Sequence, residues 1–596
     1  MAPYDFTLEG SLWDTRGDYL DFPNPSSIRQ SYNRARKICQ KSSMTTDDIV
    51  DMTAKFWDFN RELVAMRDMA VTIILVIHWN LCMGTIGKFA RRNRQDLLTL
   101  LEGLERFDIC GEYLLTELGH GLDARNLETT ATLQPDGSFI LHTPSLAAAK
   151  AMPPTTPWAG VSRVAVVFAR IIANQTDCGV KPFIVKLCEA DQMCPGVTSR
   201  LLPRRNGSKE LDHAITTFNH VRLSPSSLLG SPKASSNERA SFLSNIDRVS
   251  VGTLSLTMWN IPALKQCAYI AGTYSFRRHV SGNKPGQTVP IISFATQYRP
   301  ILNALAQAAV FNAFADDAIR LFCDSSLSPE VRHSVAACFK ATVTVASQVT
   351  INELADRCGW QGLFSYNRII ELAMSMRGNS IAEGDFTVLC IRLASEVLLG
   401  RYALPPATMK DCLLARHEAG VWQEAKEIIA SLPQSNHRGA AFNAYILPRC
   451  RSLVEATGHR MAYEAAVREN KVAPGLARLF ESSCVMSDLS WYCDQGGFKR
   501  KELIKRDVEA VEAIMPELQT LLKETEAAPW TTAPLVKEGT WNEFVHNLPT
   551  FQFNEATIET SVIRVQYRDR HAGSKSANTA VSFPIVEDSE IYISGP

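Results

Sequence analysis

The chain has 596 residues, and its 62 Lys and Arg residues balance its 62 Asp and Glu residues, so the formal net charge is +0. Hydrophobic residues make up 45% and charged residues 21%, which argues against disordered, collagen-like and coiled-coil proteins. The length predicts about three or four domains. The balanced charge argues against a nucleic-acid-binding protein, because such proteins usually carry a strong basic field.

The cysteines and the apolar runs narrow the class further. The 15 cysteines are scattered singly, and no Cys or His cluster has the spacing of a zinc site, so we expect reduced thiols, no metal and an intracellular protein. The most apolar run, Ala70–Ile77, is too short to cross a bilayer, which needs about 20 apolar residues. It predicts a buried helix, and we expect no integral membrane association.

The first region, Pro25–Leu115, is predicted to be helical because its apolar residues recur at helical spacing. The segment Thr45-Thr46-Asp47 is a suitable N-cap within it.

The sequence changes near Glu128 from helical spacing to β-rich runs, and we predict a β domain over Leu115–Leu223. The Asp136-Gly137 dipeptide predicts a hairpin turn between β-rich runs. Further strand candidates are Val164–Ala169, Phe183–Val185 and Ala214–Val221.

The remainder of the chain is predicted to be helical again. Ser224–Asn245 is rich in Ser, Pro and Asn and predicts a connection. Helical patterns cover Leu243–Tyr402 and Ala407–Ala527, and Pro516 should kink or restart a helix. The tail after Ala572 is polar and is expected to be loosely held. Composition and spacing therefore predict a mainly α protein with a β insert.

Several common catalytic motifs are absent. No Gly-x-Gly-x-x-Gly follows a strand, and no Gly-x-Ser-x-Gly occurs, which argues against a Rossmann domain and an α/β-hydrolase. Gly282–Thr288 lacks the Gly-Lys-Ser/Thr ending of a phosphate loop and predicts a surface loop.

One segment lies at the switch from helices to strands. Leu115–Gly121 has the sequence Leu-Thr-Glu-Leu-Gly-His-Gly, and Leu127–Thr132 has Leu-Glu-Thr-Thr-Ala-Thr. The pair closely resembles a signature of the acyl-CoA oxidases, within the acyl-CoA dehydrogenase superfamily. Further matches follow in the family's order between about residues 75 and 402: Leu141–Ser145 with Lys150, Phe218–Pro225, Tyr274–Arg278, Thr296–Tyr298 and Ile381–Asp385. Each is weak alone, but the ordered set is strong.

The resemblance implies the acyl-CoA dehydrogenase/oxidase fold, with a middle β-barrel domain between helical domains. We place an N-terminal helical domain at 1–115, a β domain at the flavin at 116–235, a helical domain with the catalytic base at 236–405, and a C-terminal helical domain and tail at 406–596. The long C-terminal helical block suits oxidases better than the shorter dehydrogenases.

The same resemblance implies FAD, held between the β domain and the helices, and names its contacts. Thr116 would bond the flavin ring edge, and Gly121 and Thr155 would lie at the cofactor. Arg277 would pair with the pyrophosphate, since a guanidinium fork fits phosphate oxygens, although Arg278 competes for this role. The remaining cofactor residues, reached across a dimer interface, would be Gln297, Gly359 and Gly362.

Glu383, in the family's Glu-Gly motif, is the predicted catalytic base. It would remove the α-proton of an acyl thioester as hydride leaves the β-carbon for the flavin. A carboxylate in an apolar pocket has a raised pKa and is a better base. The neighbours Ile381 and Ala382 are apolar, as such a pocket requires.

The chain also departs from the family's pattern. Where oxidases usually have Lys-Trp-Trp-Pro-Gly-Gly, Lys150–Thr155 has Lys-Ala-Met-Pro-Pro-Thr, which should reshape the pocket. A Gly-Gly-x-Gly turn becomes Gly359–Gly362, in which Trp360 would either pack or crowd the partner's FAD. Asp385 replaces a neutral residue and is expected to point away from a pyrophosphate. These departures indicate a divergent, specialised member.

We predict an FAD-dependent acyl-CoA oxidase-like homodimer that desaturates an acyl thioester and passes the electrons to oxygen, giving hydrogen peroxide. A dehydrogenase of specialised metabolism, with another acceptor or an unusual acyl group, is the alternative. A flavin-free scaffold and a helical-repeat protein are less favoured. The family is peroxisomal, but Ile593–Pro596 is not a Ser-Lys-Leu-type address, which leaves the cytoplasm open.

Overall fold

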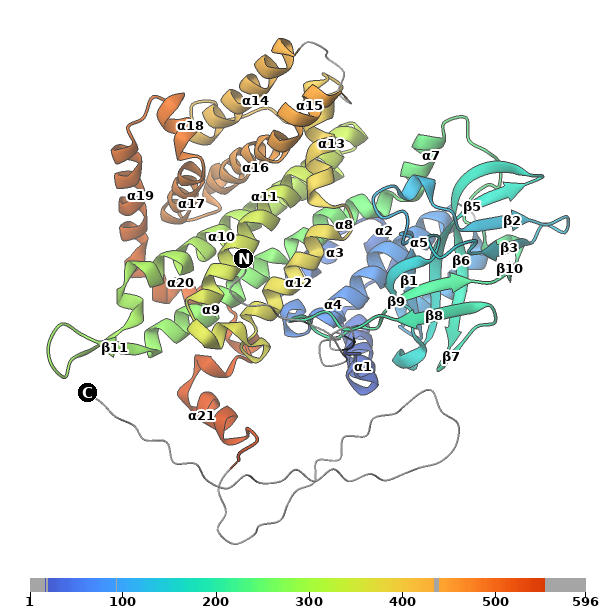
Figure 1. Ribbon diagram of the computed structural model, residues 1–596, viewed down its shortest axis with the longest axis horizontal. Helices are drawn as coiled ribbons and strands as arrows, with labels where there is room; N and C mark the ends of the chain where they lie inside the picture. Colours follow the sequence, from blue (N-terminus) through green and yellow to red (C-terminus); the bar gives the residue numbers. More distant parts are fainter. Residues whose placement is uncertain (1–16, 18–19, 93, 433–438, 552–596) are drawn as a thin grey trace, which may run out of the picture. The chain divides into compact units, whose positions relative to one another are not determined.

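A computed structural model of the protein describes residues 17, 20–92, 94–432 and 439–551. The described residues up to Phe544 belong to one compact unit, and Val545–Pro596 form a second unit, of which residues 545–551 are described. Within the first unit, the strands gather beside the N-terminal helices, and the later helices pack against one another (Figure 1). The predicted loose tail after Ala572 lies outside the described residues.

The N-terminal region is helical, as predicted. Its helices are α1 (Pro25–Ser42), α2 (Thr46–Val50), α3 (Ala54–Phe59), α4 (Met69–Val76), the π-helical turn η4 (Ile77–Met83), α5 (Gly84–Ala90) and α6 (Leu98–Glu105). Thr45 caps α2 in a reciprocal capping box with Asp48, which confirms the predicted N-cap.

Two sheets form the β insert. The strands are β1 (Ile109–Leu114), β2 (Thr130–Leu133), β3 (Phe139–His142), β4 (Lys150–Pro154), β5 (Ser162–Ala173), β6 (Thr176–Glu189), β7 (Gln192–Met193), β8 (Val197–Leu201), β9 (His213–Phe218) and β10 (Val221–Leu223). The larger sheet has the order β10-β3-β2-β5-β6-β7, with β1 parallel to β5, and the smaller has the order β4-β9-β8. The turn at Gly137, with φ of 83°, closes the predicted β2–β3 hairpin.

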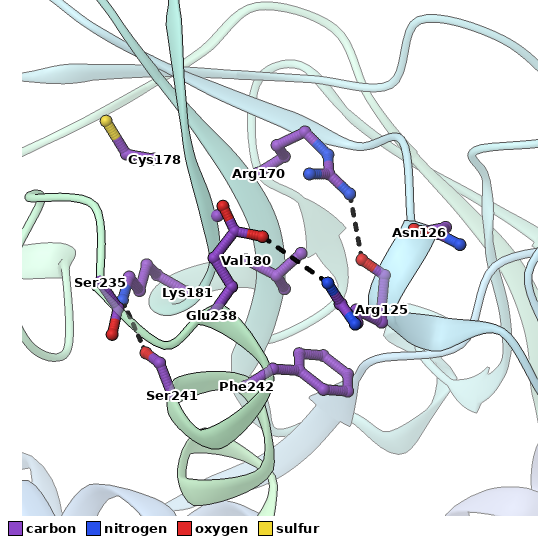
Figure 2. A pocket seen from close by; sticks show the side chains of 11 residues that line it. Arg125, Asn126, Arg170, Cys178, Val180, Lys181, Ser235, Glu238, Ser241 and Phe242 are labelled. Atoms are coloured by element: carbon purple, nitrogen blue, oxygen red, sulfur yellow. Dashed lines mark hydrogen bonds and ion pairs between the residues drawn. The ribbon is translucent and has the colours of Figure 1, made fainter.

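The edges of the insert differ from the prediction. Strand β1 lies before Leu115, in the region predicted to be helical. The prediction missed it because a strand buried in a parallel sheet carries no alternating pattern of apolar residues. The predicted connection at Ser224–Asn245 contains the helix α7 (Glu238–Asn245), which packs on β6, where Lys181 donates a hydrogen bond to Ser241 (Figure 2). Tertiary packing outweighed the weak helical propensity of this polar stretch.

The later helices pack around an apolar core. They are α8 (Asp247–Met258), α9 (Asn260–Arg277), α10 (Ala295–Cys323), α11 (Pro329–Asp356), α12 (Ile369–Ile381), α13 (Phe386–Leu398), α14 (Leu413–Ser431), α15 (Ala440–Tyr445), α16 (Cys450–Val467), α17 (Pro474–Ser487), α18 (Leu489–Asp494), α19 (Arg500–Ile514), α20 (Leu518–Glu524) and α21 (Glu538–His546). β11 (His279–Ser281) and β12 (Thr288–Pro290) pair in a short antiparallel hairpin. The loop between them belongs to Gly282–Thr288, the segment predicted to be a surface loop. The helix restarts around Pro516, as predicted.

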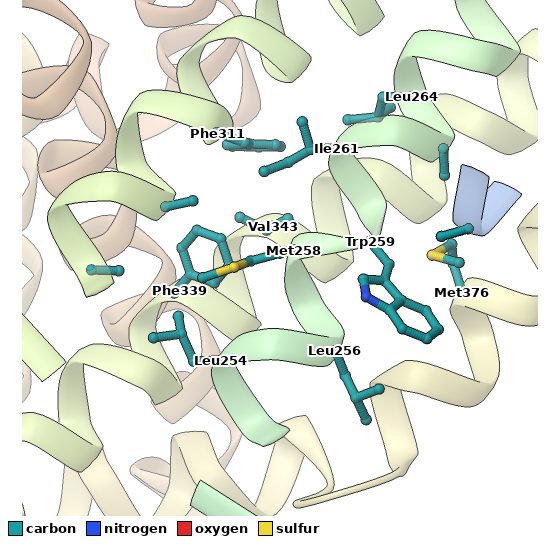
Figure 3. Close-up of a cluster of buried hydrophobic side chains, with 14 of the residues drawn as sticks. Leu254, Leu256, Met258, Trp259, Ile261, Leu264, Phe311, Phe339, Val343 and Met376 are labelled. Carbon is teal, nitrogen blue, oxygen red and sulfur yellow. The ribbon is translucent and has the colours of Figure 1, made fainter. Parts of the chain in front are cut away.

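The core joins the helices that surround the candidate site. Met258, Trp259, Phe311 and Phe339, from α8 to α11, meet in one buried cluster (Figure 3). Met69–Ala90 and Pro329–Asp356 are long and apolar enough to cross a membrane, but 89% and 78% of their most apolar windows are buried inside the structure. Their apolar character is therefore used in the core, as predicted for Ala70–Ile77.

A buried ion network ties the β insert to the helices. Arg163 on β5 donates to Asp212 at 2.9 Å and to Glu112 on β1 at 3.2 Å, and it also binds the carbonyl of Pro154. The hydroxyl of Tyr32 in α1 donates to Asp212 at 3.0 Å. Arg163 and Asp212 are almost fully buried, so the network fixes β4 and α1 against the sheet.

Replacing Asp212 by Ala should destabilise the protein by about 3 kcal/mol or more, because the Arg163 guanidinium would stay buried without its nearest carboxylate. The measurement is the midpoint of urea unfolding. Glu189→Ala, which removes one partner of the exposed Lys186–Glu189 pair, is the control and should leave the midpoint nearly unchanged. Equal midpoints for both variants would contradict a structural role for the network.

Candidate active site at Glu383

Glu383 lies in a tight backbone turn between two helices. The φ of Glu383 is 51° and that of Gly384 is 98°, so both residues have positive φ. Glycine adopts such a conformation at little cost, but glutamate rarely does. The next residue, Asp385, caps α13 by accepting hydrogen bonds from the backbone of Thr387 and Val388. Its carboxylate is therefore used within the helix start, in line with the expectation that it points away from a phosphate.

All three carbonyl groups of the turn are held by side chains from other helices. The ammonium of Lys340 in α11 donates to the carbonyl oxygens of Ala382 and Gly384, each at 2.6 Å. The hydroxyl of Thr253 in α8 donates to the carbonyl oxygen of Glu383 at 2.7 Å. Because left-handed backbone of a non-glycine residue is costly, these contacts explain how the turn persists.

The side chain of Glu383 lies directly over the backbone of α8. A Cβ atom at Gly252 would be only 1.2 Å from the Glu383 Oε2 atom, so any side chain there would displace the carboxylate. Asn80, in the π-helical turn η4, donates from Nδ2 to Glu383 Oε2 at 3.1 Å. Arg248 donates to Asn80 Oδ1 at 2.7 Å, which fixes the amide so that its NH₂ group faces the carboxylate.

Burial dominates the electrostatics of this carboxyl group. It raises the pKa of Glu383 from 4.5 to about 8, against the opposing effects of the Lys340 and Arg248 charges and the Asn80 hydrogen bond. The hydroxyl of Tyr113 on β1 is buried, and no partner for it occurs within the described part of the chain. Burial and the charges of Asp247 and Glu383 raise the pKa of this phenol, so it stays protonated.

Such an arrangement suits proton abstraction from carbon. A desolvated carboxylate with a pKa close to neutral is a stronger base than an exposed one, and some of it is ionised at pH 7. The predicted source of the apolar surroundings was wrong: Ile381 and Ala382 are exposed. The surroundings come from η4, α8 and α11 instead. Sequence spacing could not predict that these helices meet around Glu383. The lone Lys340 in an apolar helical run was a usable signal that this helix lies near a polar site.

Thr116 and Gly121, predicted for the cofactor, lie on an open edge of the β insert. Both are exposed, and Thr116 accepts a backbone hydrogen bond from Ala151 at 2.9 Å. Four large apolar side chains around them are also exposed: Leu118 (46%), Leu122 (71%), Leu146 (70%) and Met152 (46%). The buried Glu117–Lys150 pair, at 2.9 Å, holds this edge in place.

Thr155 is turned inward instead. It is fully buried, and its hydroxyl is bonded to Thr216 at 2.7 Å and to Ser199 at 2.8 Å. The two prolines before it coincide with a register shift between β4 and β9, because Pro153 and Pro154 cannot donate ladder hydrogen bonds. A ligand at this edge would meet the backbone near Thr155 and not its hydroxyl.

Arg277, Gln297, Gly359 and Gly362 form a second group, at the ends of α9, α10 and α11. Gln297 donates to the hydroxyl of Ser275 at 2.8 Å and to the carbonyl of Arg357 at 2.9 Å. Arg277 donates to the carbonyl of Leu535 at 2.8 Å, and its Nε atom is buried without a partner among the described residues. Gly359 has φ of 60°, and a Cβ at Gly362 would be 2.0 Å from the Ala355 carbonyl, so both glycines are required by the backbone.

Trp360 packs on its own chain. Its ring lies edge-on to Phe364 at 5.9 Å and to Trp541 of α21 at 6.2 Å between centroids. It remains 59% exposed, and Leu363 (66%) and Phe364 (50%) are also exposed beside it.

A charged cavity of about 70 Å³ lies between β6 and α7 (Figure 2). Three cationic side chains, those of Arg125, Arg170 and Lys181, and one carboxylate, that of Glu238, line it. Lys181 donates to Ser241 at 3.0 Å, and Arg125 pairs loosely with Glu238 at 3.7 Å. Positive charge therefore exceeds negative charge in this cavity, as a site for a phosphorylated ligand requires.

The chain is similar to acyl-CoA oxidases in its sequence and in its structure. Residues 251–398 match the model of the acyl-CoA oxidase C-alpha1 domain. A putative peroxisomal acyl-coenzyme A oxidase 1.2 of Arabidopsis thaliana is 29% identical over 58% of this chain and 55% of its own. Peroxisomal acyl-coenzyme A oxidase 3 of Homo sapiens is 28% identical over 57% and 52%. The chain thus spans about half the length of the curated relatives it matches.

Solved structures show the same fold over most of the chain. Acyl-coA oxidase3 from Yarrowia lipolytica has a TM-score of 0.74 at 18% identity and covers 96% of this chain and 92% of its own. Acyl-CoA oxidase-2 of Caenorhabditis elegans, bound with FAD, ascaroside-CoA and ATP, has a TM-score of 0.66 at 17% identity, with 89% and 94% covered. The predicted mainly α fold with a middle β domain is confirmed.

Replacing Glu383 by Gln should change how stability depends on pH. A pKa raised from 4.5 to about 8 means that the carboxyl group favours the folded state below about pH 4.5 and that this contribution is lost as the pH rises towards 8. Between about pH 5 and 8, the wild type should lose stability relative to Glu383→Gln by up to about 1.4 kcal/mol per pH unit. Urea titrations across this range measure the difference, and a constant difference would contradict the raised pKa.

Proposed function

We propose that this chain, which is similar to acyl-CoA oxidases in sequence and in fold, is an FAD-dependent acyl-CoA oxidase that desaturates an acyl thioester at the α,β position. The observation that carries the proposal is the partly buried Glu383 carboxylate, held over Gly252 by a turn whose carbonyls are all bound. Such investment in the position of one carboxylate has no purpose in a scaffold protein.

The residues of the chain divide the work of the reaction. Glu383 accepts the α-proton of the thioester, and Asn80 holds the accepting carboxylate by its Oε2 atom. The Tyr113 hydroxyl, which has no partner among the described residues, is a donor available to a substrate oxygen near the base. FAD, when bound, supplies the acceptor for the β-hydride, and molecular oxygen takes the two electrons to give hydrogen peroxide.

The residues present fit FAD. The exposed apolar side chains around Thr116 are of the kind that a large flat ring would cover, and the Thr116 hydroxyl beside them is a hydrogen-bonding group for the ring edge. The buried Nε of Arg277, for which the described part of the chain supplies no acceptor, is a donor suited to a phosphate oxygen. Thr116 and Gly121 would hold the ring end, and Arg277, Gln297, Gly359 and Gly362 the phosphate end.

We propose CoA as the carrier of the acyl group. The cavity lined by Arg125, Arg170 and Lys181 supports this choice, because CoA carries phosphates that such cations bind. By the same family resemblance, we propose a peroxisomal location.

The arrangement of the predicted cofactor residues supports a homodimer, which we propose. Thr116 and Glu383 are joined through β1, because Tyr113 of that strand lies near the base. Arg277, Gln297 and Gly359 are linked to one another instead, through Ser275 and Arg357. We propose that the second group of one subunit completes the cofactor site of the other.

The proposal is tested by the visible spectrum of the purified protein with acyl-CoAs. Wild type should show a flavin band that acyl-CoA bleaches without oxygen, and air should restore the band with one hydrogen peroxide formed per turnover. Glu383→Gln should keep the flavin and lose about 10³-fold or more in turnover. Rapid bleaching without hydrogen peroxide would indicate a dehydrogenase, and normal turnover by Glu383→Gln would contradict the assigned base.

A second variant keeps the carboxylate but moves it. Gly252→Ala places a methyl group where Glu383 Oε2 now lies, so the base must shift by an ångström or more. Turnover should fall by about 100-fold with the flavin retained. The control is Gly539→Ala, because a Cβ atom added at Gly539 meets nothing within 4 Å. This variant should leave turnover unchanged.

Mixed dimers test the shared site. Glu383→Gln and Arg277→Ala should each impair turnover alone, but a mixed dimer contains one site with an intact Glu383 and the partner's intact Arg277. Co-expression with two affinity tags should therefore give mixed dimers with up to about half of the wild-type turnover. Mixed dimers without activity, or an active monomer in light scattering, would contradict a site shared between subunits.

A further inference from the structure

Lys340 is buried in the apolar helix α11, which is an unusual place for an ammonium group. Its neighbours in the helix, Phe339 and Ala341, belong to the hydrophobic core, and burial lowers its pKa to about 8. The two hydrogen bonds of the ammonium both go to backbone oxygens, those of Ala382 and Gly384, at 2.6 Å. These carbonyls stand on either side of the Glu383 residue.

We infer that Lys340 is a positioning residue for the Glu383 base: its ammonium fixes the turn that aims the carboxylate, and its positive charge favours the ionised form. The inference rests on the proposed role of Glu383. Lys340 thus makes two contributions, one structural and one electrostatic, and substitutions at this position can separate them. A neutral donor could hold the two carbonyls, but only a cation also stabilises the charge that a base must carry before it accepts a proton.

The other groups around the base leave this task to Lys340. Toward Glu383 face Lys340 from α11, Arg248 from α8, Asn80 from η4 and Tyr113 from β1. Arg248 is engaged with Asn80, to which it donates at 2.7 and 3.0 Å, and its effect on the pKa of Glu383 is smaller than that of Lys340. Toward Lys340 face the carboxylates of Glu383 and Asp385.

The test compares the pH dependence of kcat/KM for wild type and Lys340→Met. Loss of the charge should move the acid limb of the profile upward by about one pH unit. Well below this limb, kcat/KM should then be about ten times lower. Lys340→Arg should keep the limb near its wild-type position. Thr253→Val, which releases the Glu383 carbonyl without changing any charge, should lower kcat and leave the limb in place.

Lys265→Met is the matched control, because it removes a partly buried lysine from α9 away from the turn, and it should change neither limb nor kcat. A folded Lys340→Met with the wild-type limb would overturn the inference and leave Lys340 as a core-filling residue. If Lys340→Met does not fold, Lys340→Gln keeps a donor for the carbonyls without the charge and decides the same question.

A second readout needs neither substrate nor turnover. In protein labelled with carbon-13 at the glutamate carboxyl groups, the resonance missing from Glu383→Gln identifies Glu383, and its titration should shift upward by about one pH unit in Lys340→Met. A shift in a protein that never oxidises acyl-CoA would contradict the proposed function and support the role of the lysine charge. Oxidase activity without a shift would support the proposed function and contradict the role of the lysine charge.

Discussion

The close approach of the Glu383 carboxylate to the backbone of α8 is the contact on which the site depends. It is possible only because Gly252 has no side chain, and it places a carboxylate where water has little access. Moving a charge into such a place costs free energy unless polar groups compensate. Asn80, Arg248 and Lys340 compensate in part, which leaves a group with a pKa of about 8 that is neither an ordinary exposed acid nor a permanently neutral one.

The scaffold around this contact is built to resist movement. The turn that carries Glu383 is strained, and its three carbonyls are bound by two helices that belong to the central core. Asn80 comes from a π-helical turn, a feature frequent at functional sites because it changes the direction of a side chain within a continuous helix. On the other side, the buried Arg163 network fixes β1, which carries Tyr113, against β5 and α1.

The residues proposed to hold the cofactor lie in two groups. Thr116 and Gly121 lie on the open edge of the β insert, whereas Arg277 and Gly359 lie at the ends of the core helices. Thr155 turns its hydroxyl inward, and the two prolines before it have no N–H to donate at this edge. A second copy of the chain that brings its own Arg277 would supply the polar contacts that this edge lacks.

The sequence by itself determined the mainly α architecture with a β insert, the hairpin at Gly137, the cap within Thr45-Thr46-Asp47 and, through a chain of ordered motifs, the resemblance to acyl-CoA oxidases that makes Glu383 the candidate base. These features are local or are carried by strict residue patterns. It did not determine the buried parallel strand β1, because such a strand has no alternating pattern. It also missed Asn80, Gly252 and Lys340, and it looked for the apolar surroundings of the base in Ile381 and Ala382, which are exposed. Only the packing of η4, α8 and α11 around one turn decided these, since residues far apart in sequence meet there and no local signal records the meeting.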